Sequence, residues 1–226
     1  MFSSRNLELR KMVVLAMLSA VAFVLVATIR IPVVAFLSYE PKDVAIAMGG
    51  FIFGPLAALL MSVVVSLVEM VTVSADGFYG LLMNIIATCS FVCTAAFIYK
   101  RKRTLAGAVI GLIAGIAVNV PVMLLWNYLV VPLYLGAPRE AVAGMLVPIF
   151  LPFNLVKGAL NAAFIMILYK PLITALRKTG VLSQTSQQNQ EQTGLNSSIK
   201  KYLGIILVAG FVILTCVLYV ATVLRG

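Results

Sequence analysis

Histidine is absent from the sequence, and only 11% of its 226 residues are charged. Without histidine the chain has no imidazole metal ligand, no serine–histidine–aspartate triad and no histidine general base. The motifs of P-loop ATPases, HExxH metalloproteases and GxSxG hydrolases are missing as well. These absences argue against an enzyme and predict no catalytic residue and no metal site.

Charge is also too scarce for a soluble protein. Soluble domains are about 45–50% apolar and about 25% charged, whereas 62% of this chain is hydrophobic and its mean hydropathy is +1.10. The same values exclude a disordered chain, because disorder requires low hydrophobicity and high charge. The apolar residues form long blocks separated by short basic stretches, which is typical of a polytopic membrane protein.

Cysteine is scarce, and its positions are unremarkable for chemistry. Cys89, Cys93 and Cys216 all lie within apolar blocks, and the first two are four residues apart on one helix face. Their surroundings favour a role as small packing residues. The sequence therefore indicates no disulfide framework.

Basic residues, in contrast, are in excess, with 17 lysines and arginines and a net charge of +10. A strongly basic chain can bind nucleic acid, but this one has no basic helix or basic–aromatic patch that could follow phosphates. The basic residues stand at the ends of the apolar blocks, where they determine topology in a lipid bilayer. We therefore expect the bilayer around this chain and no nucleic-acid partner.

The apolar blocks predict an all-α integral membrane protein. The first block runs without a charge and lacks a small-x-small cleavage site, so we interpret it as a retained span rather than a signal peptide. We expect a six-helix transmembrane bundle in residues 1–182, a polar cytoplasmic linker at 183–201 and one extra C-terminal transmembrane helix at 202–226. The predicted blocks are 12–29, 44–74, 80–99, 105–135, 147–169 and 203–224.

The block 44–74 is too long for one spanning helix and short for two. Gly54-Pro55 lies in its middle, where proline breaks or kinks a helix. Basic residues near the N-terminus and at 100–103 both favour the cytoplasmic side, so an even number of crossings must separate them. Two helices that meet at Gly54-Pro55 give that even number and place the N-terminus in the cytoplasm.

Ionisable residues inside the apolar blocks are functional candidates, because they cost free energy in a bilayer. Lys157 in the sixth predicted helix and Glu69 near the outer end of the third are the two examples. Asn154, Lys157 and Asn161 have i, i+3, i+7 spacing and share one helix face. Amides both donate and accept hydrogen bonds, so this stripe suits a polar heterocycle or a hydroxylated chain, although hydrogen bonding between helices is the alternative.

Other polar residues are predicted to lie where they can converge with this stripe on one pocket open to the outside. Aromatic residues beside amides suit a flat ring system, but they are equally typical of a membrane-interface belt. The residues concerned are Asn84, Asn119, Trp126, Asn127 and Tyr128 of the spans, and Tyr39, Glu40, Lys42 and Asp43 of the loop 30–43.

Small residues form two stripes that allow close approach of helices. Ala16 and Ala20 lie on one face of the first predicted helix, and Gly107, Gly111 and Gly115 repeat every four residues in the fifth. Either stripe can pack within the molecule or receive a helix of a partner.

Several of these segments resemble the S components of energy-coupling factor (ECF) vitamin transporters, most closely the riboflavin-specific (RibU-like) ones. The resemblance covers about residues 8–178 and leaves out the linker and the seventh helix. It rests on Tyr39-Glu-Pro-Lys-Asp-Val-Ala, Gly49-Gly-Phe-Ile-Phe-Gly-Pro-Leu-Ala, Trp126-Asn-Tyr with Pro132-Leu-Tyr, and Leu151-Pro-Phe-Asn-Leu-Val-Lys-Gly.

The resemblance implies the substrate-binding membrane subunit of an ECF-type ABC importer in a prokaryotic plasma membrane. Such a subunit captures riboflavin from outside and delivers it by reorienting with a transmembrane coupling subunit and two ATP-binding subunits. It has no cofactor of its own, since the flavin is the transported ligand. The resemblance implies that Asn127, Asn154 and Lys157 contact riboflavin.

The resemblance also implies roles for five further residues. Tyr39 and Glu40 belong to the loop that caps the vitamin pocket, and Asn84 matches a family asparagine at the start of the fourth helix. Ala16 and Ala20 match the small-residue face that docks on the coupling subunit.

Two departures from the family pattern leave the ligand open. A loop that usually reads Asp-x-Ser-Asp is Glu40-Pro-Lys-Asp43 here, and a frequent Lys-Asn pair near the end of the third helix is Glu69-Met70. Another vitamin, such as thiamine or pantothenate, therefore remains an alternative. A membrane enzyme would need a nucleophile–base pair or an acidic metal site, and a ligand-free scaffold would not need Lys157 beside Asn154.

Overall fold

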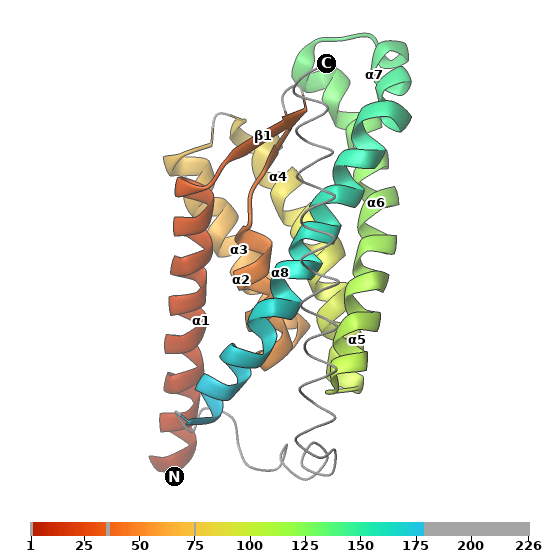
Figure 1. The fold of residues 1–226 in the computed structure, drawn as a ribbon. Coiled ribbons are helices and arrows are strands. Elements are labelled where there is room, and N and C mark those ends of the chain that lie inside the picture. The colour runs from red at the N-terminus through yellow and green to blue at the C-terminus, as the bar shows by residue number, and fades with distance from the viewer. Residues whose placement is uncertain (1, 35–36, 75, 179–226) are drawn as a thin grey trace.

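The computed structural model describes residues 2–34, 37–74 and 76–178 of the chain. These residues form a bundle of six helical stretches with one small β-hairpin at the end opposite the N-terminus (Figure 1). The predicted linker and seventh helix, at 183–226, lie outside the described residues. The elements are α1 (Phe2–Thr28), β1 (Ile31–Val34), β2 (Leu37–Tyr39), α2 (Lys42–Phe53), α3 (Pro55–Thr72), α4 (Gly77–Thr88), α5 (Thr94–Arg101), α6 (Leu105–Leu135), α7 (Arg139–Met145) and α8 (Leu151–Lys178).

Two of the six stretches are long helices interrupted by π-helical turns. The turn η1 (Cys89–Cys93) joins α4 to α5, and the turn η2 (Leu146–Phe150) joins α7 to α8. Single π-helical turns of this kind often occur at functional sites. The sixth helical stretch therefore begins at Arg139, eight residues before the predicted start at 147.

Five helical stretches of the described chain are long and apolar enough to cross a membrane, which confirms the predicted all-α membrane bundle. They are Glu8–Thr28, Pro55–Thr72, Gly77–Arg101, Leu105–Tyr134 and Arg139–Pro171. The remaining stretch, α2, has 12 residues, or about 18 Å at 1.5 Å per residue, and is shorter than the hydrocarbon core. Its residues from 42 to 52 are all buried, so neighbouring helices shelter it.

The predicted break inside 44–74 is confirmed. Gly54 ends α2 with a φ of +99°, a conformation that glycine adopts without the clash of a Cβ atom. Pro55 then occupies the first position of α3, where its missing N–H leaves no hydrogen bond unmade.

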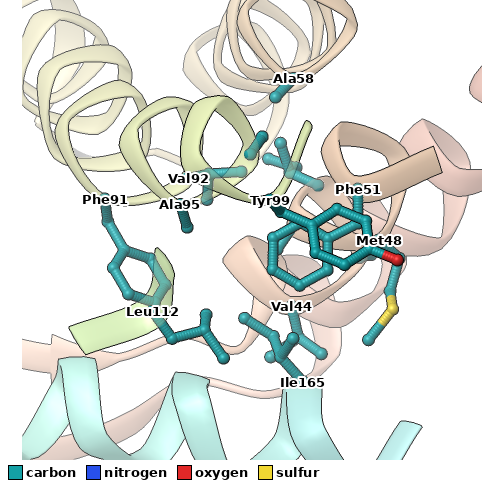
Figure 2. Close-up of a cluster of buried hydrophobic side chains, with 14 of the residues drawn as sticks. Val44, Met48, Phe51, Ala58, Phe91, Val92, Ala95, Tyr99, Leu112 and Ile165 are labelled. Carbon is teal, nitrogen blue, oxygen red and sulfur yellow. The ribbon is translucent and has the colours of Figure 1, made fainter. Parts of the chain in front are cut away.

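The short helix α2 lies at the centre of the apolar core. Figure 2 shows its Val44, Met48 and Phe51 facing side chains of the neighbouring helices. The Phe51 ring stacks on Tyr99 of α5 with a centroid distance of 4.6 Å. The Tyr99 hydroxyl is in turn 2.6 Å from that of Tyr169 on α8. This core holds three helices around α2 below the hairpin.

The hairpin after α1 was not predicted as strands. β1 and β2 pair antiparallel, with Ile31 opposite Tyr39. Val33 and Leu37 are buried and belong to an apolar cluster with Phe150 and Phe153. The hairpin is therefore packed onto the helices rather than extended into solvent.

The glycine stripe of α6 packs within the molecule. A Cβ atom at Gly111 would lie 2.7 Å from the carbonyl oxygen of Ala95, and one at Gly115 would lie 2.6 Å from that of Phe91. Both carbonyls belong to the helix Gly77–Arg101, so glycine allows α6 to approach its backbone directly. This outcome favours intramolecular packing over partner binding for the stripe.

We expect Gly111→Ala to destabilise the protein by about 1–3 kcal/mol, because the added methyl group forces α6 away from α5. The thermal unfolding midpoint of the purified protein in detergent should fall. Gly144→Ala is the matched control, since a Cβ atom there meets nothing within 4 Å. Equal midpoints for the two variants would contradict the close packing.

Candidate functional site

A cavity lies against the hairpin, between α3, α4, α6 and α8. Its wall combines polar groups with a broad apolar surface. The polar members are Arg30, Ser38, Glu40, Asp43, Glu69, Asp76, Asn84, Asn119, Asn127, Asn154, Lys157 and Asn161, and the large apolar members include Met83, Phe91, Met123, Trp126 and Phe153. Five of the six predicted substrate-binding residues therefore line one cavity, and Tyr39 is the exception.

The polar stripe of α8 faces this cavity. Asn154, Lys157 and Asn161 all belong to its wall, as their spacing on one helix face predicts. Lys157 lies 18 residues after the start of the helix at Arg139, or about 27 Å along its axis. The ammonium group makes no hydrogen bond or ion pair with any other residue between 2 and 178 that the structure describes. Lys157 is thus a cation in mid-helix that is available to a ligand.

The cavity asparagines differ in what their amides already bind. The Nδ2 atom of Asn154 donates to the Phe150 carbonyl at 2.7 Å, beside the π-helical turn η2. Its Oδ1 atom is left to face the cavity. Asn119 donates to the Ala87 carbonyl at 2.9 Å and to Ser90 at 2.8 Å, so it ties α6 to the start of η1. These two side chains stabilise irregular backbone next to the site.

Asn127 has no such commitment. Its side chain is only 3% exposed and belongs to the cavity wall, and no hydrogen bond joins it to the rest of the described chain. A buried amide without partners is costly. Both its donors and its acceptor are therefore available to a ligand.

Tyr39 lies behind the cavity wall rather than in it. Its hydroxyl donates to Asn161 Oδ1 at 2.9 Å, and Asn161 Nδ2 donates to Asp43 Oδ2 at 3.2 Å. Thr88 donates to the other oxygen of Asp43 at 2.6 Å. This chain of hydrogen bonds joins the hairpin, α8, α2 and α4, so Tyr39 orients a wall residue.

A buried ion-pair cluster forms the opposite wall, and sequence reasoning did not find it. Lys42 is 1% exposed, and its ammonium group contacts Glu69 and lies 3.5 Å from Glu40. Glu69 also accepts a hydrogen bond of 3.0 Å from Asn84. Arg30 contacts Glu40 at 2.8 Å and lies 3.9 Å from Glu69. The two departures from the family pattern, at 42 and 69, are thus partners of opposite charge.

The apolar wall separates the two readings of the aromatic residues on α6. Trp126 lines the cavity beside Phe91 and Met123, whereas Tyr128 is 37% exposed on the outside of the bundle. Only Trp126 is therefore placed to contact a ligand. Tyr128 is placed as an interface residue would be.

A second concave surface lies away from the cavity, between α1 and α3. Ala16 and Ala20 are exposed within this apolar groove, which also includes Ser19. The large side chains around them come from both helices, and they include Phe23, Leu60, Val64 and Val68. The predicted small-residue face of α1 is thus open at the surface.

Comparisons with known proteins define the class to which this fold and cavity belong. The family described as "ECF transporter, substrate-specific component" matches residues 10–169, and the chain therefore belongs to that family. The resemblance inferred from the sequence is confirmed, and the chain is a multi-pass membrane subunit of a transporter and not an enzyme.

Individual relatives narrow the comparison. The riboflavin transporter RibU of Staphylococcus aureus (strain TCH60) is 31% identical over 178 residues, which cover 75% of this chain and 93% of the relative. The riboflavin transporter FmnP of Bacillus subtilis (strain 168) is 29% identical over 190 residues, with 77% and 100% covered. A solved structure described as "Structure and mechanism of the S component of a bacterial ECF transporter" matches with a TM-score of 0.65 and 31% identity, covering 75% of this chain and 99% of that one.

The buried ion pair gives a stability prediction. Lys42→Met leaves Glu69 charged and buried without its closest cation, so we expect a loss of about 3–5 kcal/mol in the free energy of unfolding. Lys11→Met is the matched control, because Lys11 pairs with Glu8 at an exposed position, where ion pairs contribute about 0–1 kcal/mol.

Thermal unfolding of the purified variants in detergent measures both losses. The double variant Lys42→Met, Glu69→Leu should recover part of the stability that the single change loses, since it removes the stranded carboxylate. A Lys42→Met variant as stable as Lys11→Met would show that the pair contributes nothing.

Proposed function

We propose that this chain is the riboflavin-binding subunit of an ECF-type ABC importer, which captures riboflavin from outside the cell. The observation that carries the proposal is the cavity in which Asn127, Asn154 and Lys157 face a flat apolar wall. The names of the relatives, which are riboflavin transporters, support the same ligand.

The chemistry of riboflavin matches these groups one by one. The isoalloxazine ring is flat and apolar over most of its area, and Trp126 with Phe91 offers a surface for such a ring. Its uracil-like edge carries two carbonyl oxygens on either side of one N–H group. The Lys157 ammonium and the Asn127 amide can donate to the carbonyls, while Asn154 Oδ1 can accept from the N–H.

The orientation in the membrane follows from the distribution of basic residues. Lys100 and Arg101 end α5 at the same end of the bundle as the N-terminus, whereas the hairpin and the cavity lie at the opposite end (Figure 1). Because basic residues favour the cytoplasmic side, we propose a cytoplasmic N-terminus and a cavity that opens outward. Delivery then requires reorientation with a transmembrane coupling subunit and two ATP-binding subunits.

The groove on α1 and α3 supports the proposed coupling. Small residues let another helix approach closely in a bilayer, and Ala16 and Ala20 are exposed on this groove. The transmembrane coupling subunit is the partner that we propose for it. Riboflavin and this subunit would then contact different faces of the chain.

The ligand assignment is tested by titrating the purified, ligand-free protein with riboflavin and following the quenching of flavin fluorescence. We expect tight binding, and we expect Lys157→Ala and Lys157→Met to weaken it about tenfold or more, or about 1.4 kcal/mol. The Met variant keeps the length of the side chain and removes only its charge. Lys102→Ala, at an exposed position outside the cavity, is the control. Binding of thiamine or pantothenate in place of riboflavin would overturn the assignment.

The docking proposal is tested by enlarging the small residues of the groove. Ala16→Leu and Ala20→Leu should leave riboflavin affinity unchanged but abolish riboflavin uptake by cells, because the added bulk blocks close helix approach. Ala27→Leu, which is exposed on α1 but does not line the groove, is the matched control. Normal uptake by both groove variants would remove this face from the coupling.

A further inference from the structure

Carboxylates outnumber cations in the wall of the cavity. Four acidic side chains line it against two basic ones. Glu40, Asp43 and Glu69 are at most 8% exposed. At such buried positions, solvent and salt screen a charge only weakly. An anionic group that entered this side of the cavity would meet a repulsive field.

The cations on this side already serve the carboxylates. Arg30 binds Glu40 and lies 3.9 Å from Glu69, and the buried Lys42 holds both carboxylates from behind the wall. Lys157, the cation without a partner among the described residues, projects from α8 on another wall. An anion beside Glu40 and Glu69 would therefore find no uncommitted positive charge there.

The same carboxylates suit an uncharged hydroxylated chain. An ionised carboxylate only accepts hydrogen bonds, and its two oxygens offer about four lone-pair sites. In Glu69, Lys42 and Asn84 occupy two of these sites. Hydroxyl groups can donate to the remaining sites, whereas a phosphate or carboxylate group has no proton to offer at neutral pH.

We propose that the Glu40–Glu69 side of the cavity is a charge filter, which accepts the hydroxylated end of a neutral flavin and rejects phosphorylated flavin and other anionic ligands. The inference deepens the proposed function and rests on it. Selectivity of this kind comes from repulsion of the wrong ligand as much as from attraction of the right one. The Lys42 ammonium makes the filter feasible, since it stabilises the charge of Glu69 at a buried position.

The test compares two ligands that differ only in one phosphate group. Full-length protein, purified without ligand in detergent, is titrated with riboflavin and with riboflavin 5′-phosphate by flavin fluorescence. We expect the phosphate ester to bind about tenfold or more weakly than riboflavin, and we expect Glu40→Gln and Glu69→Gln each to narrow this ratio about threefold or more. Glu140→Gln, an exposed carboxylate on α7 outside the cavity, should leave the ratio unchanged.

The outcomes separate the filter from the proposed function. Riboflavin binding with an equal affinity for its phosphate ester would overturn the filter and leave the proposed function standing, whereas binding of neither flavin would overturn the proposed function. A ratio that stays unchanged in the Gln variants would make the exclusion steric and refute the role of charge. If Glu69→Gln fails to fold, Glu40→Gln decides, because Lys42 and Glu69 remain paired in that variant.

Discussion

The first turn of α2 buries an ammonium group and a carboxylate side by side in an apolar bundle, and neither can stay there without partners. Lys42 takes its partners from α3 and from the loop before α2, through Glu69 and Glu40. Asp43 takes its partners from α4 and α8, through Thr88 and Asn161. These two residues therefore determine how four elements meet, and the cavity is the space that this arrangement leaves. The short length of α2 follows from the same constraint, because a helix that begins with buried charges must lie inside the protein.

Local patterns in the sequence predicted the helices and one polar face, because periodicity and helix breakers act over a few residues. Gly54-Pro55 marked the break between α2 and α3, and the spacing of Asn154, Lys157 and Asn161 placed them on one side of α8. The ion pair of Lys42 with Glu69 and the hydrogen bond of Tyr39 to Asn161 join residues 27 and 122 positions apart. No periodicity reports such contacts. The hairpin was missed for a similar reason, since its strands have four and three residues.

The asparagines show why residue type alone does not define a binding group. Asn119 and Asn154 donate to backbone carbonyls beside η1 and η2, where the regular hydrogen-bond ladder of the helix is interrupted. Asn127 stands in regular helix and keeps its whole amide for the cavity. The sequence presents the three as equivalent intramembrane amides. Their different roles depend on where the backbone departs from α-helix, which a pattern of apolar residues does not reveal.

The cavity and the α1–α3 groove are separate surfaces, but they share two rigid elements. Arg30 follows the end of α1 and Glu69 lies near the end of α3, and both line the cavity, while Ala16 and Val64 of the same two helices line the groove. Under the proposed function, riboflavin bound against Glu40 and Glu69 would contact the ends of the helices whose middles face the coupling subunit. The connection between the two sites then runs along two helices joined by the Arg30–Glu69 and Lys42–Glu69 contacts. The charge cluster would thus select the ligand and also hold the docking face in register with the loaded site.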